Sequence, residues 1–184
     1  MYDPANPAPT VGWPLCCDAL HLKPGPHDQR PVEERDDHLV HSTPALTEDL
    51  EVTGPITLEL FASSSAVDTD FTAKFVDVWP DGFAQNLTEG IVRARYRDSR
   101  EQPQFMNPGQ TYKFTLDLWA TSNIFRKGHR LRLEVSSSNF PRFDRNLNTS
   151  EDGFSTRQPV AATNVIFHDA QHLSALILPI VPVP

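Results

Sequence analysis

The chain has 184 residues, 39% of them hydrophobic, and a formal net charge of −8. One domain with a sizeable core is the expectation for this length, and disulfide bonds are not needed to stabilise it. The acidic balance argues against a nucleic-acid partner, whose phosphates require a basic face, and the short apolar runs predict no signal peptide, no transmembrane helix and no membrane partner.

Residues 1–36 contain many of the 17 prolines and no sustained apolar period. A segment of this composition is expected to be extended and irregular, lying on the rest of the chain or on a partner domain. Its one apolar stretch runs from Val11 to Cys17 (VGWPLCC). Two interpretations of this stretch stay open, a patch packed on the chain's own strands and a loop presented to a partner.

Alternating apolar residues predict a series of strands from residue 37 onward. Short strands are expected at Asp37–Thr43 and Leu50–Thr53, and a longer one at Ile56–Ala62. Apolar residues fall on both faces of Phe71–Trp79, which is typical of a strand buried on both sides. Pro80-Asp81-Gly82 follows as the clearest hairpin turn, because proline fixes φ at one corner and glycine supplies the positive φ at the other.

A row of arginines occupies one face of the next predicted strand, Ile91–Arg97. The three are Arg93, Arg95 and Arg97. We expect them to form a ladder with carboxylates of a neighbouring strand such as Glu59 or Asp117, since cross-strand charge pairs are the ordinary use of such a face. The alternative is docking onto an acidic patch of a partner domain.

The strongest strand signals lie within residues 111–144. Apolar residues fall at every second position of Tyr112–Leu118 and again of Leu131–Val135, and Lys127-Gly128 between them is a turn signal. Two core strands joined by a loop are therefore expected. A final strand is predicted at Leu173–Ile180.

No helical period persists, and only short helical turns at residues 121–126 or 144–149 are compatible with the sequence. About eight or nine strands, with turns roughly every ten residues, predict an all-β fold. We expect a two-sheet antiparallel β-sandwich of jelly-roll type, similar to galactose-binding domains, over residues 37–184, preceded by the extended segment 1–36.

The loop Asn139–Asn146 (NFPRFDRN) combines aromatic and charged residues. Its charged side chains are expected to form ion pairs that hold the loop, and its two phenylalanines to anchor it. These residues are Arg142, Asp144, Arg145, Phe140 and Phe143. A loop held rigid in this way also suits an interface with another domain.

The sequence lacks the nucleophile elbow G-x-S-x-G of an α/β-hydrolase, because no two of its glycines bracket a serine at that spacing. Ser137 and Ser138 stand at a strand end without a flanking glycine, so their hydroxyls are expected to satisfy backbone groups of a turn. No catalytic residue is therefore assigned.

Two clusters share part of a metal-binding pattern. Asp68-Thr69-Asp70 has the spacing of a calcium loop without its later glycine and glutamate, and His168 and His172 would converge only on a helix. We predict no metal and no cofactor. His129 is expected to face solvent.

Tryptophan platforms could serve sugar binding, a frequent use of β-sandwich modules. The candidates are Trp13, Trp79 and Trp119. Each has a core or interface interpretation at least as good, since Trp119 is expected to end a buried strand and Trp79 to precede a turn.

The only two cysteines, Cys16 and Cys17, are adjacent. Neighbouring cysteines rarely pair, because the small ring is strained, so no structural disulfide is expected. Together with the lack of a secretory signal, this predicts a cytoplasmic protein.

Several long blocks, in fixed order, resemble one known family. They are PGPHDQRPVEERDD (24–37), VDTDFTAKFVDVWPDG (67–82), EGIVRARYRD (89–98), LWATSNIFRKGHRLRLEVSSSNFPRFDRN (118–146) and HDAQHLSALILPIVP (168–182). The chain resembles the C-terminal domain of the cocaine esterase / X-Pro dipeptidyl-peptidase family of serine hydrolases. In that family an N-terminal α/β-hydrolase domain carries the Ser-Asp-His triad, and the C-terminal sandwich packs on it, shapes the pocket wall and helps assemble dimers.

The resemblance implies a non-catalytic accessory domain that is inactive alone. Its partner would be an α/β-hydrolase catalytic domain, in the same polypeptide or a separate chain, with a homodimer as a further expectation. The substrate-pocket wall would include Trp13, Leu15, Cys16 and Cys17. The domain interface would include Arg93, Arg95, Phe140, Arg142 and Phe143. The alternatives are a free-standing module that binds carbohydrate or another ligand, and a purely structural oligomerisation domain.

Overall fold

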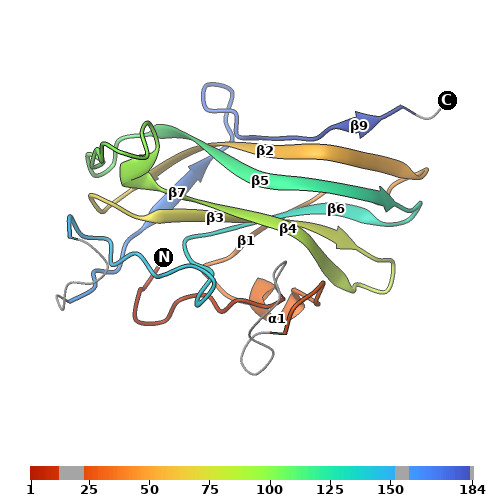
Figure 1. Cartoon of the computed structure of the whole chain (residues 1–184), viewed down its shortest axis with the longest axis horizontal. Helices are drawn as coiled ribbons and strands as arrows, with labels where there is room; N and C mark the ends of the chain where they lie inside the picture. Colours follow the sequence, from red (N-terminus) through yellow and green to blue (C-terminus); the bar gives the residue numbers. More distant parts are fainter. Residues whose placement is uncertain (13–22, 152–157, 183–184) are drawn as a thin grey trace.

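The computed structural model describes residues 1–12, 23–151 and 158–182 (Figure 1). One short helix, α1 (Arg30–Glu33), precedes the strands. The strands are β1 (Leu39–Ser42), β2 (Leu50–Ser64), β3 (Asp70–Val78), β4 (Ala84–Arg93), β5 (Tyr112–Phe125), β6 (Arg130–Ser136), β7 (Asn164–Phe167), β8 (Ala175–Ile177) and β9 (Ile180–Val181). Across these described ranges, no helix has the length and apolar character needed to cross a membrane.

The strands form two antiparallel sheets that lie face to face (Figure 1). One sheet has the order β1-β6-β3-β4. In the other, β5 pairs with one edge of β2, while β7, β8 and β9 pair in succession along its other edge. The predicted all-β, two-sheet antiparallel sandwich is confirmed. The jelly-roll connectivity and the likeness to galactose-binding domains stay predictions.

The core between the sheets follows from the period of two in β5. Phe114, Leu116 and Leu118 all point inward and are completely buried. The Phe114 ring lies 4.8 Å from the ring of Phe71 on β3, measured between centroids. Each such side chain contributes roughly 1.5–3 kcal/mol when fully buried, so apolar contact across the two layers is the main stabilising term.

All nine residues of β3 are buried, which confirms the prediction of a strand covered on both faces. Its inner face meets the core, and its outer face is covered by two irregular segments. Gln29 from the N-terminal segment accepts a hydrogen bond from Lys74 Nζ at 2.7 Å. Thr72 Oγ1 donates to the carbonyl of Ser138, in the loop after β6, at 3.3 Å.

At one long edge of the sandwich, the two sheets approach each other closely at a glycine. Gly90 of β4 lies so near β5 that a Cβ atom on it would sit 2.1 Å from the Asp117 carbonyl oxygen and 2.9 Å from a methyl carbon of Leu118. Thr88 Oγ1, on the same face of β4, donates to the Leu118 carbonyl. The two sheets therefore meet backbone against backbone at this edge, and only glycine fits.

β5 and β6 are the two core strands predicted within residues 111–144, and this prediction is confirmed. The turn between them contains Gly128 with a φ of +88°, as the turn signal required. The two strands belong to different sheets, so this turn links the layers at one end of the sandwich.

Four predicted elements need correction. The strands expected at Leu50–Thr53 and Ile56–Ala62 are one continuous strand, β2, because its pairing with β5 runs on through Gly54 and Pro55. The strand expected at Ile91–Arg97 ends at Arg93, and Ala94–Tyr96 forms a 3-10 turn, because Asp68 Oδ1 accepts the Arg95 backbone N–H and pulls the chain off the ladder. The segment 121–126 is not a helical turn, since β5 runs through to Phe125. The final strand is divided into β8 and β9, with Pro179 lying between them.

The prediction that Trp119 ends a buried strand is wrong. Trp119 lies within β5, is 63% exposed and has a φ of 65°, a conformation uncommon for a bulky side chain. The register between β2 and β5 shifts between Pro55 and Thr57, opposite Trp119. The bulge inserts an extra residue there and turns the indole outward.

We predict that Gly90→Ala destabilises the protein by about 3 kcal/mol or more, because the new methyl group meets backbone atoms that cannot move aside. Gly109→Ala is the matched control. Its Cβ would meet nothing within 4 Å, and only the positive φ of +81° costs energy, about 1 kcal/mol. Urea unfolding of both variants measures the difference. Equal stability of the two variants would contradict the close approach of β4 and β5.

Candidate domain interface

A row of three buried charged side chains crosses the outer face of the β1-β6-β3-β4 sheet. Glu134 of β6, Lys74 of β3 and Glu89 of β4 are register partners, and they are only 1%, 4% and 3% exposed. Lys74 Nζ lies 3.9 Å from Glu134 Oε2. Charged groups are almost never this buried unless they are paired, so the row requires polar partners from the segments that cover the sheet.

The N-terminal segment supplies the first of these partners through Gln29. Besides accepting from Lys74, Gln29 donates through Nε2 to the carbonyls of Val11 at 2.9 Å and His27 at 3.0 Å. His27 N in turn donates to Asn86 Oδ1 of β4 at 2.6 Å. One buried amide thereby ties together two arms of the segment, residues 11–12 and 24–29, and fastens both to the sheet.

Helix α1 brings a further carboxyl group to the row. Glu33 Oε2 accepts from Arg132 of β6 at 2.6 Å. Burial raises the pKa of Glu134 to about 8, opposed by the charge of Lys74 and reinforced by the neighbouring Glu33 carboxyl group. The sequence did not predict α1, since four residues are too short to show a helical period.

The loop after β6 covers the other end of the row. Asn139 Nδ2 donates to Glu89 Oε2 at 2.8 Å, and Arg142 Nε lies 2.9 Å from Glu89 Oε1. Burial raises the pKa of Glu89, while Arg142 and Lys74 oppose that rise. The cis peptide Phe140-Pro141 lies between these two contacts.

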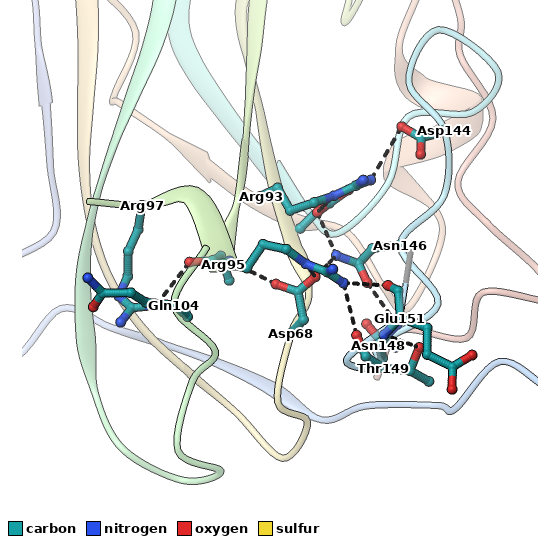
Figure 2. A network of polar contacts seen from close by, with 12 residues as sticks. Asp68, Arg93, Arg95, Arg97, Gln104, Asp144, Asn146, Asn148, Thr149 and Glu151 are labelled. Carbon is teal, nitrogen blue, oxygen red and sulfur yellow. Dashed lines mark hydrogen bonds and ion pairs between the residues drawn. The ribbon is translucent and has the colours of Figure 1, made fainter. Parts of the chain in front are cut away.

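A second polar network holds the loop 144–151 against β3 and the 3-10 turn (Figure 2). Arg95 Nε donates to Asp68 Oδ2 at 2.7 Å, and Arg95 Nη2 reaches the carbonyls of Thr149 and Glu151 at 2.9 and 2.8 Å. Asn146 Nδ2 bridges Asp68 and Asp70, at 2.7 and 2.8 Å. A single guanidinium therefore joins a buried carboxylate to two loop carbonyls.

Arg93 completes this network on the neighbouring strand. Its Nε and Nη2 donate to the two oxygens of Asp70, both at 2.9 Å, and Nη2 also reaches Asp144 at 3.3 Å. Burial raises the pKa of Asp70, and the hydrogen bonds and charge of Arg93 oppose that rise. A bidentate pair of this kind is among the stronger polar contacts in proteins.

The predicted arginine ladder does not form as a cross-strand row. Arg93 pairs with Asp70 of the neighbouring strand β3, but Arg95 and Arg97 lie at the 3-10 turn, where Arg97 pairs with Asp98. The expected carboxylate partners are engaged elsewhere. Glu59 pairs with Lys113 at 2.9 Å, and Asp117 Oδ1 accepts the backbone N–H of Trp119. Both carboxylates belong to the other sheet and are out of reach of Arg93. Counting residues outward from the Pro80-Asp81-Gly82 turn would have paired Asp70 with Val92, but the irregularity at Phe75/Val76 shifts the register by one residue and places Asp70 opposite Arg93.

The loop Asn139–Asn146 is held by polar contacts with other segments of the chain, not by ion pairs among its own residues. Its charged residues bind Glu89, Arg93 and the Pro4 carbonyl, respectively through Arg142, Asp144 and Arg145. Phe143 packs its ring 5.0 Å from the Arg142 guanidinium carbon. Phe140 exchanges backbone hydrogen bonds with Ala8 and Thr10, and its side chain is 41% exposed.

The predicted pocket-wall residues lie outside the described part of the chain. They are Trp13, Leu15, Cys16 and Cys17. The described residues on either side of them lie close together, since a Cβ on Gly12 would come within 2.8 Å of the Gly25 carbonyl oxygen. Gly12 and Gly25 therefore lie side by side on the sandwich, next to Asn86 of β4.

The serine hydroxyls at the end of β6 are predicted to serve the backbone. This holds for Ser138, whose Oγ accepts from the backbone amide of Ala8 at 2.8 Å, but not for Ser137, whose Oγ accepts from the side-chain amide of Asn164 at 2.7 Å. His129 does not face solvent, contrary to expectation. Its side chain is mostly buried, with Nδ1 2.8 Å from Asp77 Oδ1 and the ring packed against Trp79.

The two acidic or histidine clusters are occupied by contacts within the chain. Asp68 and Asp70 bind arginines, and Asp169 accepts the backbone N–H of His172 at 2.9 Å. Within residues 1–12, 23–151 and 158–182, no three His, Cys, Asp or Glu side chains gather as metal ligands would.

Comparison with protein families identifies one match. The model of the X-Pro dipeptidyl-peptidase C-terminal non-catalytic domain matches residues 2–177. Among curated proteins, the chain is 48% identical to cocaine esterase from Rhodococcus sp. (strain MB1 Bresler), with 98% of this chain and 32% of that protein covered. The resemblance inferred from the sequence is thereby confirmed.

Two solved structures share the fold with a TM-score of 0.89 and 32% sequence identity each. One is an aminopeptidase from the marine sediment archaeon Thaumarchaeota archaeon, and the other is an alpha-amino acid ester hydrolase. The matches cover 98% and 97% of this chain but 32% and 31% of those chains. The chain thus spans about a third of the length of these relatives.

We predict that Arg95→Met lowers the free energy of unfolding by about 3–5 kcal/mol, because it leaves the buried Asp68 carboxylate without its cation. Methionine keeps the apolar stem of the side chain and removes the charge. Arg100→Met, at an exposed position, is the control and should change stability by no more than about 0.5 kcal/mol. Urea unfolding measures both, and a loss below about 1 kcal/mol for Arg95→Met would contradict this role.

Proposed function

The chain belongs to the X-Pro dipeptidyl-peptidase C-terminal non-catalytic domain family, and from this membership we propose that it is the accessory domain of a serine hydrolase. It packs on an α/β-hydrolase catalytic domain, which supplies the nucleophile, base and oxyanion hole. The observation that carries the proposal is a full-length match to relatives about three times as long, two of which have ester hydrolase or esterase names.

The N-terminal segment is proposed to contribute to the substrate pocket. In this division of the chain, residues 1–36 lie across the sandwich 37–184, and Trp13, Leu15, Cys16 and Cys17 form part of the pocket wall. The contacts of Gln29 and Asn86 support this role, because they hold Val11 and His27, which precede and follow these residues in the chain. A wall of this kind positions the acyl group without taking part in bond making.

The loop after β6 is proposed to contact the catalytic domain. Arg93, Arg95 and Arg142 hold its backbone in place through the buried carboxylates described above. Phe140 is exposed on this ordered backbone, and Phe143, three residues later, packs against Arg142. Aromatic surface is therefore available at a well-ordered position. Exposed aromatic groups on ordered backbone are characteristic of interface hot spots.

We further propose that the complete protein acts in the cytoplasm and forms a homodimer. The two cysteines, both within residues 13–22, fit a reducing compartment.

Hydrolysis of 4-nitrophenyl acetate tests the proposal. The chain alone is expected to show no turnover above background, because it lacks a nucleophile elbow. A chimera in which this chain replaces the matching third of cocaine esterase is expected to hydrolyse the ester at least on the order of 100-fold faster than cocaine esterase with that third deleted, since correct positioning of groups at the pocket is restored.

Serine-dependent turnover by the chain alone would contradict the proposal. So would a well-folded chimera, verified by circular dichroism and size-exclusion chromatography, with no more activity than the deletion.

A further inference from the structure

The carboxyl groups of Glu33 and Glu134 are neighbours where α1 contacts β6. Oε1 of Glu33 and both carboxyl oxygens of Glu134 are buried without a hydrogen-bond donor. The remaining oxygen of Glu33 is bound by Arg132. An acceptor-only pair of this kind is satisfied when the two carboxyls share one proton, which then makes a hydrogen bond between them.

The surrounding charges indicate which group holds that proton. Six charged side chains meet here from α1, β3, β4, β6 and the loop after β6, and five of them have close partners. Arg132 binds Glu33 at 2.6 Å, Arg142 binds Glu89 at 2.9 Å, and Lys74 Nζ donates to the neutral amide of Gln29 at 2.7 Å.

Glu134 is the one of these six side chains that lacks a partner at hydrogen-bond distance. Its nearest cation, Lys74, is 3.9 Å away, beyond hydrogen-bond distance. A buried carboxylate without a donor is costly in its charged form, so Glu134 is the position at which the proton is held.

We propose that the proton shared by Glu33 and Glu134 is a latch that keeps α1 docked on the sheet, and that α1 is released when this proton is lost. Release has a consequence for the whole N-terminal segment. Gln29 directly precedes α1 and holds the carbonyls of Val11 and His27. When α1 moves away, both arms of the segment lose their common attachment to Lys74.

The pH range follows from the titration of Glu134. Its pKa is raised from 4.5 to about 8 when α1 is docked, so the docked state binds more protons than the open state between these values. The stability of docking is therefore complete below about pH 4.5, declines as the pH rises, and levels off above about pH 8. Between pH 7 and pH 9 the ratio of open to docked α1 should increase about tenfold.

Hydrogen exchange at α1 tests the latch. The amides of Val32 and Glu33 donate to the Gln29 carbonyl at 2.9 and 3.1 Å, and a four-residue helix released from the sheet should not keep these bonds. Relative to intrinsic exchange rates, their protection should fall about tenfold from pH 7 to pH 9 in the wild-type chain. In Glu134→Gln, whose amide can donate to Glu33 at every pH, protection should change less than twofold.

Glu89→Gln is the matched control, because Glu89 belongs to the same row but faces Arg142 and Asn139 instead of α1. It should keep the tenfold pH response of the wild type. Protection of Leu116, in the opposite sheet, separates local release from global unfolding and should not follow that of Val32. The latch is overturned if wild-type Val32 and Glu33 show no pH-dependent loss of protection, or if Glu134→Gln loses protection as the wild type does.

Discussion

The structure depends on the burial of one lysine between two glutamates on the outer face of a sheet. Lys74, Glu134 and Glu89 point away from the apolar core, yet less than 5% of each is exposed. Such a row is stable only when other groups supply its missing hydrogen bonds. The N-terminal segment and the loop after β6 provide these groups, through Gln29 and through Asn139 with Arg142. The charged row thus decides where two irregular segments lie.

The core between the sheets and the outer face of the β1-β6-β3-β4 sheet therefore have different roles. Apolar packing between the sheets and the approach of Gly90 to β5 make a rigid body. Buried polar contacts on one outer face then attach segments that have no regular structure of their own. Polar attachment is more specific than apolar attachment, because each hydrogen bond fixes an orientation. A domain whose proposed task is to present a pocket wall and a docking loop to another domain benefits from that precision of placement.

The sequence predicted the sandwich and most strands because a period of two is a local property. It also predicted that β3 is buried on both faces. It could not predict what covers β3, because Gln29 and Arg142 reach their partners from 45 and 53 residues away in the chain. The arginine partners were wrong for a similar reason, since the bulge at Phe75/Val76 sets the register that pairs Asp70 with Arg93. The exposure of Trp119 depends on another bulge. The assignment of Trp13, Leu15, Cys16 and Cys17 to a pocket wall stays a prediction.

Replacing Lys74 by methionine tests the central claim most directly, because it removes the charge from the row and keeps much of the side-chain volume. Hydrogen exchange should then show at least about tenfold loss of protection at Val32 in α1 and at Phe143 after β6, since Gln29 loses the donor that attaches it to the sheet and Glu89 loses a neighbouring positive charge. Leu116 in β5 should keep most of its protection. Equal loss at all three positions, or no loss at Val32 and Phe143, would contradict the account.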